Sequence, residues 1–366
     1  MDIRLAPARY IREPGIISRV DQYLHHMGEK AMLIGGKTAL SIAGGPVRKS
    51  IEKTGVKVVS ELWYGGECSW ENIEKLAGEM KENEVDFVVG IGGGKALDTV
   101  KKAAYDLAIP VVTVPTIAAT CAAWTPLSII YSPDGHYLES NRESQQPALV
   151  LVDPVVIAEA PYRYLISGMG DTLAKWYETD VAVKKAGRNA ATMSAHSLSL
   201  LCKKMIEEYG VEAKAGAENK EISAALNHVI DAIVAVSGMV SDLGGDGCAS
   251  AAAHPVATGL TLNDEVHKMY HGEVVSYGVL CQLILEEQEE KNIEEYLGIS
   301  EKLGLPITIA DMGSDGFSKE ELAKISSKTV QAKNLENMPF PITAEMVGQA
   351  ILTADQKGTA YREKMK

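Results

Sequence analysis

The sequence lacks the marks of several large protein classes. Its five cysteines are odd in number and far apart, and no CxxC pair occurs among the 366 residues. Neither a disulfide framework nor a cysteine zinc site is therefore indicated, and we expect reduced thiols in a cytoplasmic protein. Residues 1–10 lack a charged start followed by an apolar stretch, so they do not resemble a signal peptide.

Positive charge is also scarce. Lys and Arg number 36 against 49 Asp and Glu, which gives a formal net charge of -13, and no long run of Lys and Arg occurs. Such a chain repels nucleic acid and anionic membranes. We therefore expect a small-molecule substrate, with neither nucleic acid nor membrane as a partner.

One segment, between Asp106 and Asp134, contains no charged residue at all. It exceeds the roughly 18–20 residues that make a membrane-spanning helix plausible. Four prolines interrupt it, namely Pro110, Pro115, Pro126 and Pro133. Because proline breaks helices and the intervening residues are β-branched and threonine-rich, the segment predicts a buried strand and an ordered loop that lies against something.

Up to about residue 160, short apolar runs alternate with stretches of helical spacing. The apolar runs are residues 30–36, 56–60, 86–94, 109–115 and 148–154. This alternation predicts a parallel sheet covered by helices, in an α/β dinucleotide-binding domain of residues 1–160. "LSIIYSPDGHYLES" at 127–140 predicts a hairpin, because "SPDG" is a favourable turn.

From residue 161 to 366 the strand signals stop. The pattern is helical and rich in Ala, Leu, Glu, Lys and Met. The sequence therefore predicts a second, all-helical domain over residues 161–366.

Glycine is concentrated in "FVVGIGGGKALDTVKKAA", which reads as a strand, a glycine turn and a helix with Asp98 in its first turn. Glycines let the backbone approach a pyrophosphate closely, and the following helix start presents unpaired amides. A nucleotide-binding loop is favoured over a merely tight turn. The stretch nevertheless fits neither the GxGxxG nor the GxxxxGK[ST] template.

A second glycine pair, in "IGGKTA" at 34–39, follows an earlier predicted strand. An acidic residue at such a position holds the ribose 2'-hydroxyl of NAD, whereas a nearby cation accommodates the 2'-phosphate of NADP. Here Gly36 and Lys37 stand without an acid. They favour NADP(H) over NAD(H), although glycines there could equally be turn residues.

Three residues of the helical half, Asp171, His254 and His271, could converge on one metal ion. One carboxylate and two imidazoles suit Zn²⁺ or Fe²⁺ and leave a position open for a substrate oxygen. Each residue also has an ordinary interpretation: Asp171 as a helix cap, His254 at a small-residue packing site and His271 as a helix start.

Several ordered motifs extend over nearly the whole chain. They are "GGECS" at 65–69, "GIGGGKALDTVK" at 90–101, "VPTIAAT" at 114–120, "LSIIYSPDG" at 127–135, "GMGDTLAKWYE" at 168–178, "AAHPVATGLT" at 252–261 and "YHGEVVSYG" at 270–278. With them the chain resembles the iron-containing alcohol dehydrogenase superfamily in its glycerol dehydrogenase-like branch. The hydroxycarboxylate dehydrogenases are closest, because of "TIAATCAAWTPLS" and "GDTLAKWYE".

The resemblance implies a dehydroquinate synthase-like fold, a homo-oligomer, and Asp171, His254 and His271 as ligands of Zn or Fe. It places Gly93, Gly94, Lys95 and Asp98 at the cofactor pyrophosphate. The rest of the implied dinucleotide site is Thr116, Ala119, Thr125, Leu127 and Tyr131.

Departures from the family pattern bear on the substrate. Glycerol dehydrogenases carry an aspartate where this chain has Cys121, and nothing as bulky as Trp124 beside it. Loss of that carboxylate removes repulsion against an anionic substrate. Lys175 stands where other branches place a further histidine ligand, and it could pair with Asp171, meet a substrate carboxylate, weaken metal binding or be an ordinary helix cation.

We therefore expect metal-dependent, reversible hydride transfer between NAD(P)H and a small 2-oxo or 2-hydroxy acid, with Cys121 and Trp124 at the substrate and Lys175 in the catalytic site. The alternative is a glycerol, polyol or alcohol dehydrogenase. A lyase like dehydroquinate synthase would need a cluster of cations for a phosphate-bearing substrate, and the sequence shows none apart from Lys175.

Overall fold

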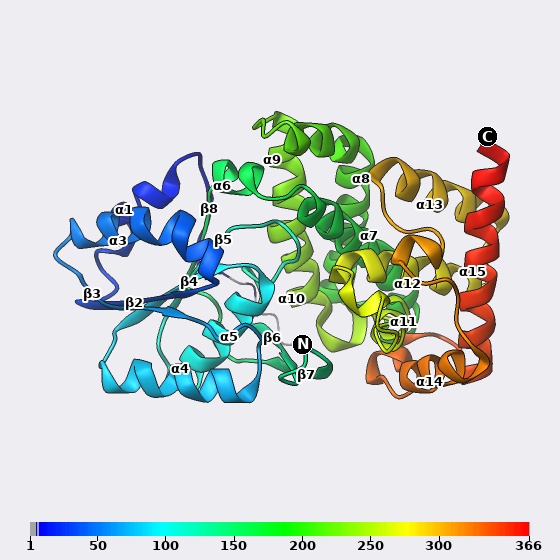
Figure 1. Cartoon of the computed structure of the whole chain (residues 1–366), viewed down its shortest axis with the longest axis horizontal. Coiled ribbons are helices and arrows are strands. Elements are labelled where there is room, and N and C mark those ends of the chain that lie inside the picture. Colours follow the sequence, from blue (N-terminus) through cyan, green and yellow to red (C-terminus); the bar gives the residue numbers. More distant parts are fainter. Residues whose placement is uncertain (1–4, 6, 366) are drawn as a thin grey trace. The chain divides into compact units, whose positions relative to one another are not determined.

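The computed structural model describes Leu5 and residues 7–365, which divide into two compact units (Figure 1). The α/β unit comprises the described residues up to Tyr162 together with Gly216–Gly238. The helical unit comprises Arg163–Ala215 and the described residues from Met239 onward. A parallel sheet followed by helices confirms the predicted fold class.

The α/β unit is built on a six-stranded sheet in the order β1-β8-β5-β4-β2-β3, and every pair in it is parallel. Its strands are β1 (Tyr10–Arg12), β2 (Lys30–Gly35), β3 (Lys57–Trp63), β4 (Phe87–Gly92), β5 (Val111–Pro115) and β8 (Leu149–Val152). The central strands β2, β4 and β5 are almost fully buried, as expected for parallel strands covered on both faces. The predicted hairpin is present as β6 (Leu127–Tyr131) and β7 (Tyr137–Arg142).

Helices pack on both faces of this sheet, as the alternation of patterns predicts. One face is covered by η1 (Ile16–Ser18), α1 (Asp21–Leu24) and the continuous run α2 (Lys37–Ala39), η2 (Leu40–Gly44) and α3 (Gly45–Glu52). The other face is covered by α4 (Trp70–Glu82) and α5 (Gly94–Tyr105). The short helix α6 (Pro154–Glu159) follows β8, and Figure 1 shows α3 and α4 on opposite sides of the strands.

Two features of the α/β unit differ from the sequence-based description. The three-residue strand β1 was not predicted, because so short a strand shows no periodicity. Residues 216–238, with α9 (Ala224–Asp231) and η3 (Ala232–Val236), belong to this unit although the predicted division placed them in the helical domain. The Asp231 carboxylate explains the difference: it accepts bonds from Arg12 Nε at 2.8 Å and the Tyr10 hydroxyl at 2.7 Å, both on β1.

The helical unit is arranged around α12 (His271–Leu285), which is buried along almost its whole length. Its other helices are α7 (Arg163–Ala186), α8 (Ala190–Glu218), α10 (Ser237–Cys248), α11 (Ala253–Leu260), η4 (Val266–Lys268), α13 (Glu290–Leu303), η5 (Ala310–Met312), α14 (Lys319–Val330), η6 (Lys333–Asn337) and α15 (Ala344–Met365). Helices α11, α13 and α15 all pack against α12.

Two glycines let α7 and α12 cross at very short range. A Cβ on Gly272 would lie 1.8 Å from the Ser167 carbonyl oxygen, and one on Gly170 would lie 2.4 Å from the Gly272 carbonyl oxygen. The Gly272 amide donates to Ser167 Oγ at 3.0 Å. Because Gly170 precedes Asp171 and Gly272 follows His271, this crossing sets the distance between two of the candidate metal ligands.

One helical run among the described residues, Ala224–Cys248, is long and apolar enough to cross a membrane by length and composition. In its most apolar window 67% of the residues are buried inside the protein. A core helix of a soluble protein meets the same criterion, so the run is weak evidence for a membrane segment.

We predict that Gly272→Ala lowers the free energy of unfolding by roughly 1–3 kcal/mol, because the new methyl group overlaps the α7 backbone. Urea denaturation followed by circular dichroism measures the change. Gly78→Ala is the control, since Gly78 is exposed within α4 with no atom within 4 Å of its Cβ position, and this variant should gain up to about 1 kcal/mol. A Gly272→Ala protein as stable as the wild type would contradict the tight crossing.

Candidate functional site

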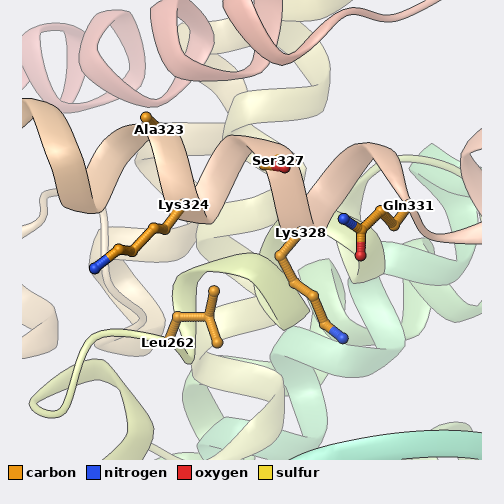
Figure 2. Close-up of a pocket in the computed structure, with 6 residues that line it drawn as sticks. All are labelled: Leu262, Ala323, Lys324, Ser327, Lys328 and Gln331. Atoms are coloured by element: carbon orange, nitrogen blue, oxygen red, sulfur yellow. The ribbon is translucent and has the colours of Figure 1, made fainter.

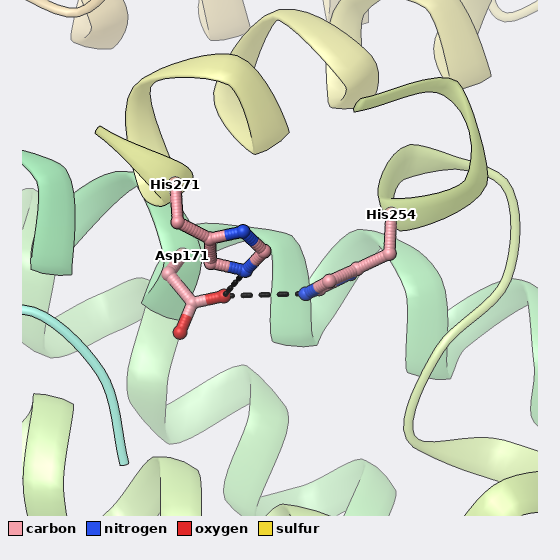
Figure 3. Close-up of side chains that lie close together, drawn as sticks. All are labelled: Asp171, His254 and His271. Atoms are coloured by element: carbon pink, nitrogen blue, oxygen red, sulfur yellow. Dashed lines mark ion pairs between the residues drawn. The ribbon is translucent and has the colours of Figure 1, made fainter. Parts of the chain in front are cut away.

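The structure brings Asp171, His254 and His271 together within the helical unit (Figure 3). Asp171 lies on α7, His254 near the start of α11, and His271 is the first residue of α12. One potential ligand atom from each residue lies within 4.8 Å of the other two. The metal set inferred from the sequence is thus a spatial cluster, and its role as a metal site remains a proposal.

The donor set fits a divalent cation. Asp171 Oδ1 is buried without a hydrogen-bond partner, and it lies 3.3 Å from His254 Nε2 and 3.7 Å from His271 Nε2. Ligands bound tetrahedrally to zinc at about 2.0–2.2 Å lie roughly 3.3–3.6 Å apart, which is close to the spacing observed. One carboxylate and two imidazoles also leave a coordination position for a substrate oxygen.

Glu178 fixes the orientation of His254. Its fully buried carboxylate accepts His254 Nδ1 at 2.5 Å and the His254 amide at 3.1 Å, together with the Ala251 amide at 2.8 Å and Ser250 Oγ at 3.2 Å. With Nδ1 engaged, Nε2 of the same ring is directed toward Asp171. A carboxylate behind a ligand histidine is the usual support of a protein metal site.

Glu178 was not predicted from the sequence, although the sequence contains a signal for it. Asp171, Lys175 and Glu178 occupy positions i, i+4 and i+7 of α7 and so share one helix face. All three are almost completely buried. A stripe of buried charged residues at helical spacing indicates a functional site more strongly than its single members do.

Lys175 adds a positive charge to this cluster. It is 6% exposed, and its electrostatic interactions reach Asp171, Glu178 and both imidazoles. A buried ammonium beside two buried carboxylates compensates part of their charge. The position predicted for Lys175 in the catalytic site is therefore consistent with the geometry, and its part in the chemistry remains a proposal.

The protonation states of two of the three ligands suit a cation. Burial would raise the pKa of the Asp171 carboxyl, but Lys175 and the two imidazoles hold it well below its usual range. Desolvation within the cluster lowers the pKa of His271 against the opposing charge of Asp171, although 49% of the His271 side chain is exposed. Burial would also lower the pKa of His254, yet Glu178 and Asp171 raise it to about 9, so a metal ion would compete with a proton there.

The predicted cofactor residues of the α/β unit gather at one edge of its sheet. Gly36 and Lys37 follow β2, Gly93 follows β4, and Thr116 follows β5. These strands are neighbours in register, with Gly35 beside Ile91 and Gly92 beside Pro115. The carboxyl ends of parallel strands are where α/β sheets bind their ligands.

The glycine loop itself is tightly packed. A Cβ on Gly93 would lie 2.7 Å from Ile117 Cδ1, and no side chain caps the start of α5 at Gly93. A small hollow of about 10 Å³ is lined by the glycine loop and the following uncharged loop, at Gly92, Gly93, Gly94, Leu97, Pro115, Ile117, Ala119, Thr120, Ala122 and Ala123. The uncapped helix start is the feature that favours a phosphate group at this position.

Lys95 is held beside the start of α5. Its ammonium lies 2.5 Å from Glu67 Oε1 and 5.2 Å from the centre of the Tyr131 ring. The structure thus joins three segments far apart in the sequence: "GGECS", the glycine loop and strand β6. Glu67 is a second residue that the sequence analysis quoted but did not single out.

The contacts of Asp98 differ from the contact with the cofactor pyrophosphate that the resemblance implies. Its carboxylate is buried, 2.9 Å from Lys101 Nζ, and accepts the Ile129 amide at 3.0 Å. Burial raises the pKa of Asp98 against the lowering effect of Lys101. These contacts favour a carboxylate that fixes the start of β6 over one that touches the pyrophosphate.

The uncharged loop carries the remaining predicted residues. Thr116 and Thr125 are buried, whereas Ala119, Cys121 and Leu127 are partly exposed. Trp124 is 6% exposed, with its ring 5.8 Å from that of Tyr10, and it fills the space where a Cβ on Gly238 would lie 2.3 Å away. The burial of Trp124 is explained more directly by packing than by substrate contact. Cys121, in contrast, keeps accessible surface.

A further hollow lies on the helical unit (Figure 2). It is open and lined by Leu262 and five residues of and just after α14: Ala323, Lys324, Ser327, Lys328 and Gln331. It contains no carboxylate or imidazole. We therefore do not consider it a site of chemistry.

Comparisons with known proteins agree with this arrangement. The family model for iron-containing alcohol dehydrogenase matches residues 7–154. A glycerol dehydrogenase of Thermotoga maritima is 40% identical over 358 residues, covering 96% of both chains, and hydroxycarboxylate dehydrogenase A of Escherichia coli is 33% identical, covering 94% of this chain and 95% of its own. The crystal structure of glycerol dehydrogenase from Schizosaccharomyces pombe superimposes with a TM-score of 0.92 at 27% identity, covering all of this chain and 93% of its own.

We predict that Asp171→Asn and His254→Ala lose most of the bound metal, because each removes one of three ligands. Glu178→Gln should weaken metal affinity about 10- to 100-fold through misorientation of His254. Metal content after dialysis against graded chelator, measured by mass spectrometry, tests both effects. His136→Ala, an exposed residue of the α/β unit, is the control. Wild-type metal content in His254→Ala would refute the site.

Proposed function

The chain belongs to the iron-containing alcohol dehydrogenase family, and as such we propose that it catalyses the reversible NAD(P)-dependent oxidation of glycerol or another small polyol. It is an NAD(P)-dependent oxidoreductase acting on CH–OH groups of small molecules. The observation that carries the polyol proposal is the 40% identity to a glycerol dehydrogenase over 96% of both chains, while the cluster of Asp171, His254 and His271 supports the metal that either substrate class would need. The preference for a hydroxy or oxo acid expected from the sequence is not confirmed.

Each residue of the cluster has a different part in the proposed reaction. Asp171, His254 and His271 would hold a divalent cation, Zn or Fe. When bound, the cation supplies Lewis acidity toward a substrate oxygen and the nicotinamide ring exchanges the hydride. Glu178 holds the proton of His254 at Nδ1 and so keeps Nε2 available as a ligand. Lys175 adds positive charge to the cluster, and it would stabilise negative charge that develops on a substrate oxygen there.

A second candidate substrate class, the 2-hydroxy and 2-oxo acids, is favoured by two side chains. Lys175 offers a buried positive charge to a substrate carboxylate, and Cys121 is neutral where the resemblance implies an aspartate in glycerol dehydrogenases. Hydroxycarboxylate dehydrogenase A, 33% identical to this chain, is consistent with it. The two candidates share the metal, the cofactor and the reaction type, and differ in the charge of the substrate.

We predict a higher kcat/KM for glycerol and 1,2-diols than for 2-hydroxy acids. Nicotinamide absorbance at saturating cofactor measures both rates. Cys121→Asp should widen the difference by about tenfold or more, because the added carboxylate repels an acid and accepts a polyol hydroxyl. Cys121→Asn is the matched neutral control. If the wild type prefers 2-hydroxy acids, and 2-oxo acids in the reverse direction, the second candidate replaces the first.

For the cofactor, NADP(H) is proposed over NAD(H). The exposed Lys37 ammonium follows β2 and lies 4.3 Å from the centre of the Trp63 ring, at the end of neighbouring β3. Residues 35–39 contain no carboxylate that would bind a ribose 2'-hydroxyl or repel a 2'-phosphate. The cation therefore favours the phosphorylated dinucleotide.

We predict that the wild type uses NADPH with a higher kcat/KM than NADH, and that Lys37→Asp lowers the NADPH to NADH ratio about tenfold or more through charge repulsion. Lys49→Asp changes the net charge equally at an exposed residue of α3 and should leave the ratio within about twofold. An unchanged ratio in Lys37→Asp would exclude Lys37 as the discriminating residue.

A homo-oligomer in the cytoplasm, as expected from the sequence, completes the proposal. Size-exclusion chromatography with light scattering measures the assembly state.

A further inference from the structure

One lysine of the glycine-loop motif has no part in the chemistry described so far. Lys101 lies on α5 and is completely buried. Its ammonium donates to three backbone carbonyl oxygens, those of Ala122 at 2.7 Å, Thr125 at 2.8 Å and Leu127 at 2.5 Å. An ammonium has three protons, so each proton has a carbonyl partner within one short loop.

Asp98, one turn earlier on the same helix, completes the arrangement. Its Oδ1 lies 2.9 Å from the Lys101 ammonium, and its Oδ2 accepts the Ile129 amide. The Asp98 carbonyl oxygen accepts Ser128 Oγ at 3.1 Å. A buried charge pair is costly unless its remaining hydrogen-bonding capacity is used. Here the Lys101 protons bond the loop and Asp98 Oδ2 bonds the start of β6, whereas Asp98 Oδ1 accepts no hydrogen bond and is balanced by the Lys101 charge alone.

The loop held in this way is the uncharged segment between β5 and β6. A further bond, from Thr113 Oγ1 to the Ala123 carbonyl oxygen at 2.7 Å, ties it to the sheet. The loop carries Ala119, Cys121 and Thr125 and leads into Leu127, the first residue of β6, whereas Gly94 and Lys95 lie at the other end of the region, at the start of α5. Helix α5 is thus a rigid connection, about 9 Å long between Lys95 and Lys101, between two parts of the same candidate site.

We propose that Lys101 is a positioning residue, which preorganises the loop of residues 116–127 for the dinucleotide through its three carbonyl contacts. This proposal rests on the proposed dinucleotide site of the α/β unit. Lys101 contacts no ligand itself: its ammonium is enclosed by protein oxygens. It acts by setting where the loop lies relative to the glycine turn before the cofactor arrives, so that binding does not have to order the loop.

The test compares Lys101→Met with Lys102→Met. Methionine keeps most of the length of lysine but donates no hydrogen bond. The neighbouring Lys102 is 8% exposed and pairs with Asp106 at 2.7 Å and Glu143 at 2.8 Å, outside the loop of residues 116–127. We expect Lys101→Met to raise the dissociation constant for NADPH roughly 10- to 100-fold, and Lys102→Met to leave it within about twofold. Nucleotide fluorescence measures both.

Two readouts separate positioning from general stability. Hydrogen exchange should accelerate at the amides of residues 117–127 in Lys101→Met while amides of β2 and β4 stay protected, and the KM for cofactor should rise far more than that for substrate. A folded Lys101→Met protein with wild-type NADPH affinity would overturn the proposal. If the wild type itself binds no dinucleotide, the proposed function fails instead.

A measurement on the wild type covers the case in which Lys101→Met does not fold. Preorganisation requires the hydrogen-bonded amides of this loop, those of Trp124 and Thr125, which donate to the Cys121 carbonyl oxygen, to be protected from exchange in the cofactor-free protein. Exchange there at the rate of an unstructured peptide, followed by protection on addition of NADPH, would refute preorganisation without any variant. Protection in both states supports it.

Discussion

The close crossing of α7 and α12 is the constraint on which the candidate metal centre depends. Because Gly170 and Gly272 have no side chains, the backbones of α7 and α12 are in direct contact there. Their chain neighbours Asp171 and His271 are thereby brought within reach of one ion. The surrounding core supports this contact, because α12 is enclosed by α11, α13 and α15. A larger residue at either glycine would separate two ligands that come from different helices, so the small residues belong to the site as much as the ligands do.

Charge is distributed along α7 in a way that packing alone does not require. A buried carboxylate, a buried ammonium and a second buried carboxylate follow one another on a single face at Asp171, Lys175 and Glu178. The ammonium reduces the repulsion between the two acids, and the second acid accepts a hydrogen bond from Nδ1 of His254. The cluster therefore keeps its donor atoms in place by bonds among its own members.

Sequence reasoning located the fold class, five strands of the parallel sheet, the hairpin and the residues of the metal cluster, because strand alternation, turn chemistry and motif order are local signals. It missed β1 and the assignment of residues 216–238, which depend on the Asp231 bonds to Tyr10 and Arg12 across more than two hundred residues. It quoted Lys101 and Glu178 within motifs without seeing their roles, since the carbonyl groups and imidazole that they bind come from other segments. Trp124 packs into the space left by the absent side chain of Gly238, and a linear pattern does not show that these two segments meet.

The ion pair between Lys95 and Glu67 has a consequence for coenzyme binding. When a dinucleotide phosphate binds at Lys95, the lysine would exchange the Glu67 carboxylate for the phosphate. The net gain in binding free energy would therefore be smaller than the charge of an unpaired lysine suggests. If Lys95 contacts the coenzyme phosphate, the pair would lower the affinity for the coenzyme, and Glu67 would lie within reach to re-form the ion pair when the coenzyme leaves.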